Sequence, residues 1–253
     1  MKYNRLLPVF VPLAVWGLLQ LFSFKPALIY ISLVLQVALL FFTFLQFCRE
    51  SKSSKDWWNF LILPALFTIA VTAYATLGKN RLFVQALFFL DLAVLYLYLR
   101  FSFYYLIRPA SYKVSAIENL SSFGSFLTFF LSAAAIYAFQ SFISAPVGLL
   151  ALFVMMISGL MIYQIIWVNN LKAKENLIHI LVGCLVLVEL AWTISFLPIN
   201  YNIAGLTLAV FYYIFIGLTK HSLAGALDRT KVKQYLGFGL LSILLILLTA
   251  KWL

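Results

Sequence analysis

Long apolar segments alternate with short polar stretches along the whole chain. A bilayer core about 30 Å thick needs about 20 apolar residues for each crossing helix. Nine segments approach or exceed this length, and they predict an all-α, polytopic integral membrane helix bundle. The nine segments are 7–24, 26–48, 58–77, 82–100, 121–143, 146–168, 177–197, 202–219 and 235–252.

Basic residues fall mainly in every second connection between these segments. Thirteen Lys and Arg lie before the first segment or in the stretches 49–57, 101–120, 169–176 and 220–234, whereas the opposite side carries only Lys25, Lys79, Arg81 and Lys251. Because cytoplasmic loops retain Lys and Arg, this asymmetry predicts nine crossings with the N-terminus in the cytoplasm and the C-terminus outside. We expect the protein in the plasma or inner membrane of the cell.

We expect one transmembrane domain over residues 1–253, because no connection is long enough for a soluble domain. The first four segments superpose on the next four by a shift of 120 without gaps, so that Pro26 meets Pro146 and Asn80 meets Asn200. This spacing suggests a parallel 4+4 repeat with halves 1–120 and 121–234 and a final helix at 235–253. Evenly spaced helices of any origin would also superpose in this way.

The net charge of +11 comes from 18 basic and 7 acidic residues, and membrane topology explains it better than nucleic-acid binding. Cys48 and Cys184 lack a CxxC partner, and the two histidines have no cluster of cysteines or carboxylates beside them. The HExxH, P-loop and GxSxG motifs are absent. We therefore expect no cofactor, no metal site and no nucleic-acid partner, and an enzyme is the weakest of the classes considered.

Two carboxyls lie near the middle of predicted membrane segments, Asp91 in 82–100 and Glu189 in 177–197. An ionisable group at that depth costs several kcal/mol unless it is neutral, paired or hydrated, which makes it a functional candidate. Helical spacing offers Thr193 as a partner of Glu189, Tyr98 as a partner of Asp91, and Thr72 on a hydroxyl stripe in 58–77. A protonated carboxyl that only bonds a neighbouring helix is the alternative.

Two further groups of residues suggest contacts rather than chemistry. Small side chains follow one face of the segment 121–143, which is typical of close helix packing in lipid; they are Ser121, Ser125, Thr128 and Ser132. The predicted cytoplasmic stretch 220–234 is basic and suits contact with anionic lipid; its basic residues are Lys220, Arg229, Lys231 and Lys233.

The last 70 residues carry the most distinctive sequence, with Leu197-Pro198-Ile199-Asn200-Tyr201, Phe211-Tyr212-Tyr213, Leu227-Asp228-Arg229 and Lys233-Gln234-Tyr235-Leu236. This region resembles a family of uncharacterised multi-pass membrane proteins of bacteria. The resemblance implies a membrane helix bundle and brings no activity and no site residues.

Our first functional hypothesis is a carrier of a small solute or lipid, with proton coupling through Asp91 and Glu189 in a shared cavity. The second is a non-catalytic scaffold or partner-binding subunit, whose partner is another membrane protein or a second copy of the chain. The third is an intramembrane enzyme acting on a lipid-linked substrate. In every case the first partner is the lipid bilayer.

Overall fold

The computed structural model describes residues 6–51, 57–108, 112, 115–169, 171 and 177–250. These described residues form nine α-helices and one short 3-10 turn, and all nine helices are long and apolar enough to cross a membrane. The chain is a multi-pass integral membrane protein, and the predicted all-α class is confirmed. The helices are α1 (Leu7–Phe24), α2 (Ile29–Ser51, preceded by the turn η2, Pro26–Leu28), α3 (Trp57–Ala75), α4 (Arg81–Ile107), α5 (Ala116–Ile143), α6 (Val147–Val168), α7 (Leu177–Ser195), α8 (Tyr201–Leu223) and α9 (Arg229–Thr249).

Two predicted connections are shorter than the sequence indicated. We expected connections between the membrane segments at 101–120 and 220–234, but α4 continues to Ile107, α5 begins at Ala116 and α9 begins at Arg229. The Asp228 side chain caps α9 by accepting a hydrogen bond from the Arg229 backbone N–H at 2.6 Å. The error arises because a scan for apolar residues stops at the first charge, whereas a helix can continue into the headgroup region.

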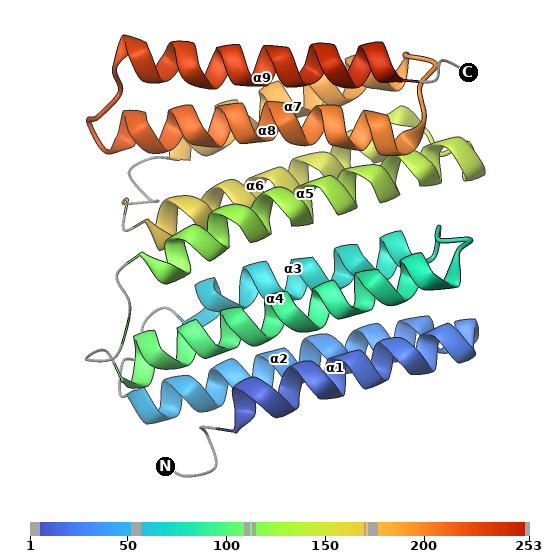
Figure 1. Ribbon diagram of the computed structural model, residues 1–253, viewed down its shortest axis with the longest axis vertical. Coiled ribbons are helices and arrows are strands. Elements are labelled where there is room, and N and C mark those ends of the chain that lie inside the picture. Colours follow the sequence, from blue (N-terminus) through green and yellow to red (C-terminus); the bar gives the residue numbers. More distant parts are fainter. Residues whose placement is uncertain are drawn as a thin grey trace. The chain divides into compact units, whose positions relative to one another are not determined.

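The chain divides into two compact units, Met1–Gly124 and Ser125–Leu253. In the first unit, α1 packs against α2 and α4, and α3 packs against α2 and α4, which closes a four-helix bundle (Figure 1). Helices α2 and α4 also touch across this bundle. The largest side chains of its core are aromatic, and Phe44, Phe47, Phe67, Phe88 and Tyr98 are all buried.

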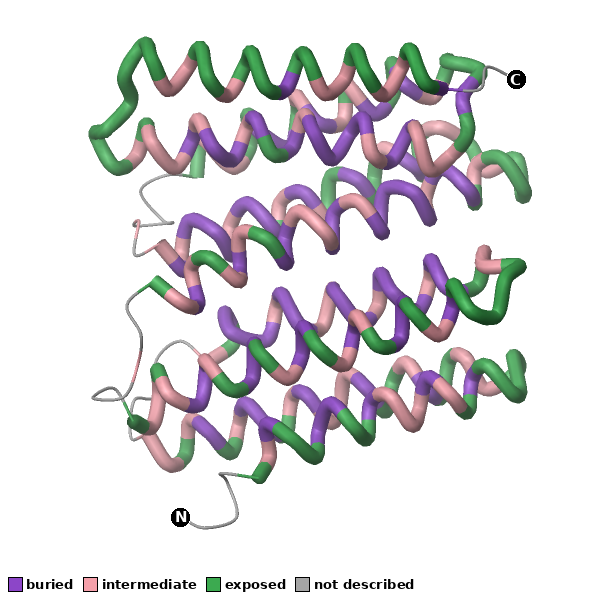
Figure 2. Tube along the Cα trace, in the orientation of Figure 1, coloured by how far each residue is buried: buried purple, intermediate pink, exposed green. Residues whose placement is uncertain are grey.

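The second unit contains most of α5 together with α6 to α9. Helix α7 packs against α6 and α8, and α9 packs against α8. Helix α5 meets α8 through the stacked rings of Phe129 and Tyr212, whose centroids are 4.3 Å apart. Helix α9 lies at the edge of this unit, and Gly239 is the one residue of α9 that is buried (Figure 2). The exposed leucines of α9 suit contact with lipid tails.

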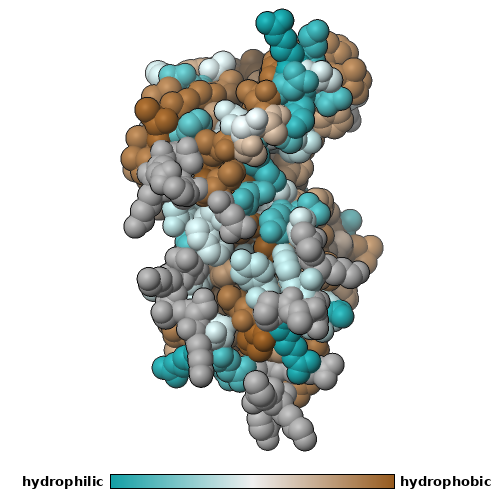
Figure 3. All heavy atoms as spheres, turned by 90° about the vertical axis from the view of Figure 1, so that its left-hand side faces the viewer, coloured by the Kyte–Doolittle hydropathy of each residue, from teal (hydrophilic) through white to brown (hydrophobic). Residues whose placement is uncertain are grey.

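In each unit, one end of the helices is more polar than their sides. For the first unit this is the end where α4 finishes, and for the second unit it is the end where α9 begins; hydrophilic side chains with apolar side chains beside them are seen in Figure 3. The charge asymmetry assigns each of these ends to the cytoplasm, and we call each the predicted cytoplasmic end of its unit.

Candidate functional site: a buried carboxyl beside a polar seam

Asp91 lies at the middle of the membrane-crossing part of α4. Arg81 begins this helix and Arg100 lies near its predicted cytoplasmic end. These two arginines are about 28 Å apart at 1.5 Å per residue, close to the thickness of a bilayer core. Asp91 is about 15 Å from Arg81 and about 13 Å from Arg100 along the helix axis by the same rise. Its carboxyl is therefore at the depth where an ion is most costly.

The Asp91 side chain is completely buried, with 0% of its surface exposed. Neither of its carboxyl oxygens has a hydrogen-bond partner among the described residues. The face of α4 that carries Asp91 also carries Leu95, Tyr98 and Ser102 at helical spacing, and all three are buried. Tyr98 thus lies on the same buried face as Asp91, two turns away. The described residues give the Ser102 hydroxyl no hydrogen-bond partner either.

A buried polar seam crosses the same unit, made of Ser32 and Gln36 on α2 and Thr68 and Thr72 on α3. The Ser32 hydroxyl donates to the carbonyl of Leu18 on α1 at 2.9 Å, and the Gln36 amide donates to Ser32 Oγ at 3.0 Å. The Thr72 hydroxyl contacts Gln36 Oε1 at 3.4 Å and the Thr68 carbonyl at 2.7 Å. Hydrogen bonds therefore connect three helices through the apolar interior.

The polar seam and Asp91 lie at one depth. Helices α2 and α4 run in the same direction, and the ring contacts Phe44–Tyr98 and Phe47–Phe103 fix their register. These pairs place a residue of α2 level with the residue 54 to 56 positions later on α4. The residue of α4 level with Gln36 is therefore Asp91 or an immediate neighbour.

Helix α1 brings a further polar group to this depth. Its register against α4 is set by a pair of amides, in which Gln85 Nε2 donates to Gln20 Oε1 at 2.9 Å, and by the Trp16 and Phe89 rings, 5.9 Å apart. The same register puts Trp16 within one helical turn of the level of Asp91. The Trp16 indole N–H is buried and has no partner among the described residues. Buried polar groups are nearly always hydrogen-bonded, so two unpaired ones at nearly the same depth, the Asp91 carboxyl and the Trp16 indole, require an explanation.

A carboxyl in such surroundings has one clear chemical capacity. The neutral acid is tolerated in an apolar interior, whereas the carboxylate needs a cation, a donor or water. Asp91 can therefore hold a proton in one state of the bundle and release it in a state that admits water or a ligand. The hydroxyl and amide groups of the polar seam are neutral, so they can bond a polar solute without adding charge.

Glu189 belongs to the second unit, where its side chain is exposed on α7. The Thr193 hydroxyl donates to the backbone carbonyl of Glu189 at 2.9 Å, so this hydrogen bond does not engage the Glu189 carboxyl. Thr193 is exposed as well. A cavity shared by Glu189 and Asp91 stays a prediction.

The predicted packing stripe lies on the buried side of α5. Ser121, Ser125, Thr128 and Ser132 are between 0% and 8% exposed. A close approach of α5 to α8 in the second unit lies beside this stripe, where Ala134 meets Gly205 of α8. A packing function for the stripe stays a prediction.

The basic residues predicted to meet anionic lipid surround the turn between α8 and α9. Lys220 and Lys231 are half-buried, whereas Arg229 and Lys233 are exposed. The Lys231 ammonium donates to the Ala226 carbonyl at 2.8 Å and lines a cavity of about 360 Å³ with His221 and Tyr235. Contact of these residues with lipid stays a prediction.

The family of the chain follows from a comparison with protein-family profiles. The family described as "protein of unknown function (DUF5656)" matches residues 6–249. The chain belongs to this family. The match runs from the start of α1 to the end of α9, so the DUF5656 family comprises all nine helices. The resemblance to an uncharacterised family is therefore confirmed. Comparisons with curated proteins and with solved structures gave no match.

Sequence reasoning missed three polar groups of this DUF5656 chain that lie in the first unit within about one helical turn of the depth of Asp91: the Gln36 amide, the Ser32 hydroxyl and the Trp16 indole. A signal was available for Gln36, since a glutamine in the middle of an apolar segment is as unusual as a carboxyl. Its depth in the membrane matches that of Asp91 when each residue is counted from the end of its segment that is predicted to lie outside the cell. The direction in which each side chain points could not be obtained from such counting, because it depends on how the four helices are rotated about their axes relative to one another.

Proposed function

We propose that this DUF5656 protein is a proton-coupled carrier of a small solute or lipid, with Asp91 as the group that takes up and releases the proton. The observation that carries the proposal is the completely buried Asp91 carboxyl, whose two oxygens have no hydrogen-bond partner among the described residues. An unpaired acid at mid-membrane is costly to keep, and intramembrane acids of this kind serve proton and ion pathways in pumps and transporters.

The polar seam supports the same proposal. Gln36 and Thr72 present amide and hydroxyl groups at the depth of Asp91, and both are buried. Such neutral groups can bind a polar part of a substrate while the bundle interior stays apolar. In this proposal Thr72 and Gln36 orient the substrate, and Glu189 with Thr193 forms a second acidic position in the other unit. The N-terminus lies in the cytoplasm, and the protein occupies the plasma or inner membrane.

The test uses the full chain reconstituted in liposomes that contain a pH-sensitive dye. A potassium gradient with valinomycin imposes a membrane potential, and internal pH is followed while pools of candidate solutes are added outside. The proposal predicts solute-dependent proton movement by the wild type. Asp91→Asn keeps the shape of the side chain and removes its titration, so it should abolish that movement in a folded protein.

Asp228→Asn is the matched control, because Asp228 is an exposed carboxyl that caps α9 outside the apolar core. It should leave proton movement unchanged. A separate measurement on Glu189→Gln tests whether the carboxyl of the second unit takes part in proton movement. If Asp91→Asn moves protons like the wild type, or if the wild type moves none with any pool, the carrier proposal is wrong. A non-catalytic scaffold is then the better hypothesis.

A further inference from the structure

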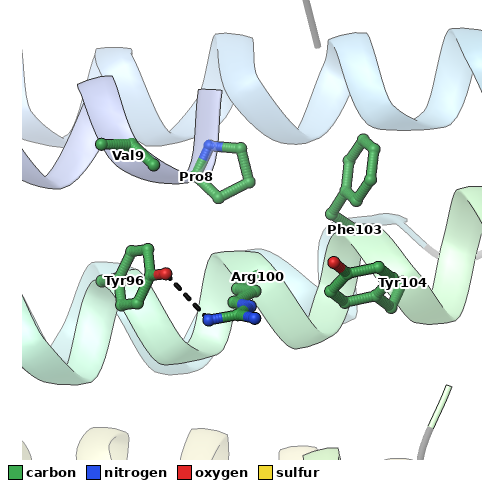
Figure 4. Close-up of a pocket in the computed structure, with 6 residues that line it drawn as sticks. All are labelled: Pro8, Val9, Tyr96, Arg100, Phe103 and Tyr104. Carbon is green, nitrogen blue, oxygen red and sulfur yellow. Dashed lines mark hydrogen bonds between the residues drawn. The ribbon is translucent and has the colours of Figure 1, made fainter. Parts of the chain in front are cut away.

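The structure assigns a binding site for the phosphate of an anionic phospholipid to the pocket around Arg100, at the predicted cytoplasmic end of α4. Figure 4 shows Arg100 between Tyr96 and Tyr104, one helical turn to either side, with Pro8 and Val9 of α1 and Phe103 facing them. These residues enclose a cavity of about 210 Å³. The site is separate from Asp91 and does not depend on the proposed carrier function.

The Arg100 charge has no acidic partner among the described residues that line the pocket. The guanidinium donates to the Tyr96 hydroxyl at 2.9 Å and lies 5.8 Å from the centre of that ring. The Tyr104 hydroxyl interacts with it from the other side. Both tyrosines hold the guanidinium in place and leave its charge uncompensated. Because a guanidinium has five donors in a rigid fork, its remaining N–H groups can bind two phosphate oxygens.

The depth of the pocket favours a lipid over a soluble anion. Arg100 is about 28 Å from Arg81 along α4, so the two arginines mark the two boundaries between hydrocarbon and headgroups. Tyrosine is enriched at this boundary. Pro8, Val9 and Phe103 give the pocket an apolar wall, against which the glycerol and first acyl carbons of a phospholipid can lie. A hydrophilic anion would leave this wall without a contact.

The first turn of α1 adds a favourable field on the same side. Helix α1 begins at Leu7, its N-cap residue Leu6 makes no side-chain cap, and Pro8 stands within the first turn. The positive end of the α1 dipole is therefore next to Arg100, where it favours an anion. This contribution is secondary, since the guanidinium supplies the full charge and the directed donors.

The experiment measures how much phosphatidylglycerol raises the unfolding temperature of the purified full-length protein in detergent. A ligand that binds only the folded state stabilises it according to its concentration and affinity. Phosphatidylcholine and inorganic phosphate are titrated in parallel. We expect phosphatidylglycerol to stabilise the wild type at several-fold lower concentration than phosphatidylcholine, and inorganic phosphate to have no effect at the same concentrations.

Arg100→Gln should weaken the apparent affinity for phosphatidylglycerol about tenfold, the loss expected for one charge-assisted hydrogen-bonding group. Arg81→Gln is the matched control: it removes the same charge from the other end of α4, where the arginine lies over the Phe24 ring at 5.9 Å. It should change the affinity less than about twofold, because Arg81 does not line the pocket and an exposed charge without directed hydrogen bonds to the ligand contributes little. Tyr104→Phe should give an intermediate loss.

If the Arg100→Gln variant does not fold, Arg100→Lys replaces it in the experiment, because it preserves the charge and the fold. It should still bind phosphatidylglycerol more weakly than the wild type, because lysine lacks the planar fork of donors. Equal effects of the Arg100 and Arg81 variants would overturn the proposal, since they would show a general charge effect. Protection by inorganic phosphate at the concentrations at which the lipid protects would also overturn it, because the ligand would then be a free anion.

Discussion

A close backbone contact between α5 and α8 in the second unit gives the sharpest prediction for stability. Gly205 of α8 lies directly against the backbone of Ala134 in α5. A Cβ atom added at Gly205 would be 2.6 Å from the Ala134 nitrogen, 2.7 Å from its Cα and 2.8 Å from its Cβ. Ordinary van der Waals contact begins near 3.4 Å. Because two of the three atoms belong to backbone, no side-chain rotation can relieve Gly205→Ala.

The size of the effect follows from this geometry. The two helices would have to separate by about 0.6 to 0.8 Å, and a gap of that size forfeits a quarter to a half of each dispersion contact along the seam. Overpacking of this kind costs about 1–3 kcal/mol. Alanine recovers up to about 1 kcal/mol through its better helix propensity. We therefore expect Gly205→Ala to lower the free energy of unfolding by about 1–2 kcal/mol.

The assay is thermal unfolding of the full chain in detergent, followed by circular dichroism. For chains of this size, 1 kcal/mol corresponds to about 2–4 °C. Gly237→Ala in α9 is the matched control, since a Cβ there meets nothing within 4 Å, and it should be neutral or stabilising. Adding Ala134→Gly to Gly205→Ala should restore stability only in part. If Gly205→Ala is as stable as Gly237→Ala, the close α5–α8 contact is wrong.

Three further predictions concern other parts of the chain. Gln20→Leu or Gln85→Leu alone should destabilise the first unit by about 1–3 kcal/mol in chemical denaturation, because one half-buried amide loses its partner, whereas the double variant should cost less than the sum of the two. Ser125→Leu or Ser132→Leu should cost roughly 1–3 kcal/mol in the same measurement by overpacking a buried face, and unaltered stability would mean that the stripe is not packed. Reporters fused after Lys113 and after Leu253 should give cytoplasmic and exterior signals respectively, and two signals from one side would contradict the nine-crossing topology.

The sequence was sufficient for the class of fold and for the approximate position of every helix, because length and hydropathy determine what crosses a bilayer. It was insufficient at the polar ends of α4, α5 and α9. There the helices extend beyond the apolar residues, since backbone hydrogen bonds and the Asp228 cap still favour helix in the headgroup region.

The candidate site was only half predictable, for a different reason. The cost of a charge in lipid identified Asp91 from its position in the sequence alone. The identity of its neighbours depends on helix rotation and register, which ring contacts such as Phe44–Tyr98 settle in the folded chain. Arg100 was similarly visible only as a charge at a helix end. The two tyrosines that hold it are one turn away on α4, but Pro8 and Val9 of the apolar wall come from α1, more than 90 positions earlier.

The proposed 4+4 repeat bears on whether the polar seam serves the scaffold or the function. Three helix pairs of the first unit have counterparts in the second. The pair α2–α3 corresponds to α6–α7, α3–α4 to α7–α8, and α2–α4 to α6–α8. A shift of 120 carries the polar positions of the first unit onto apolar ones: Gln36 onto Met156, Thr72 onto Trp192 and Asp91 onto Phe211.

If the halves are related, these three helix pairs therefore form in the second unit with apolar side chains at the three positions that match Gln36, Thr72 and Asp91. Met156 and Trp192 are exposed in the second unit, so their positions do not even require burial there. A group that the pairing of helices does not need, and that costs free energy to bury, is retained for another reason. This difference between the halves favours a functional Asp91 over a structural one, and it supports the proposal that Asp91 is the group that takes up and releases the proton.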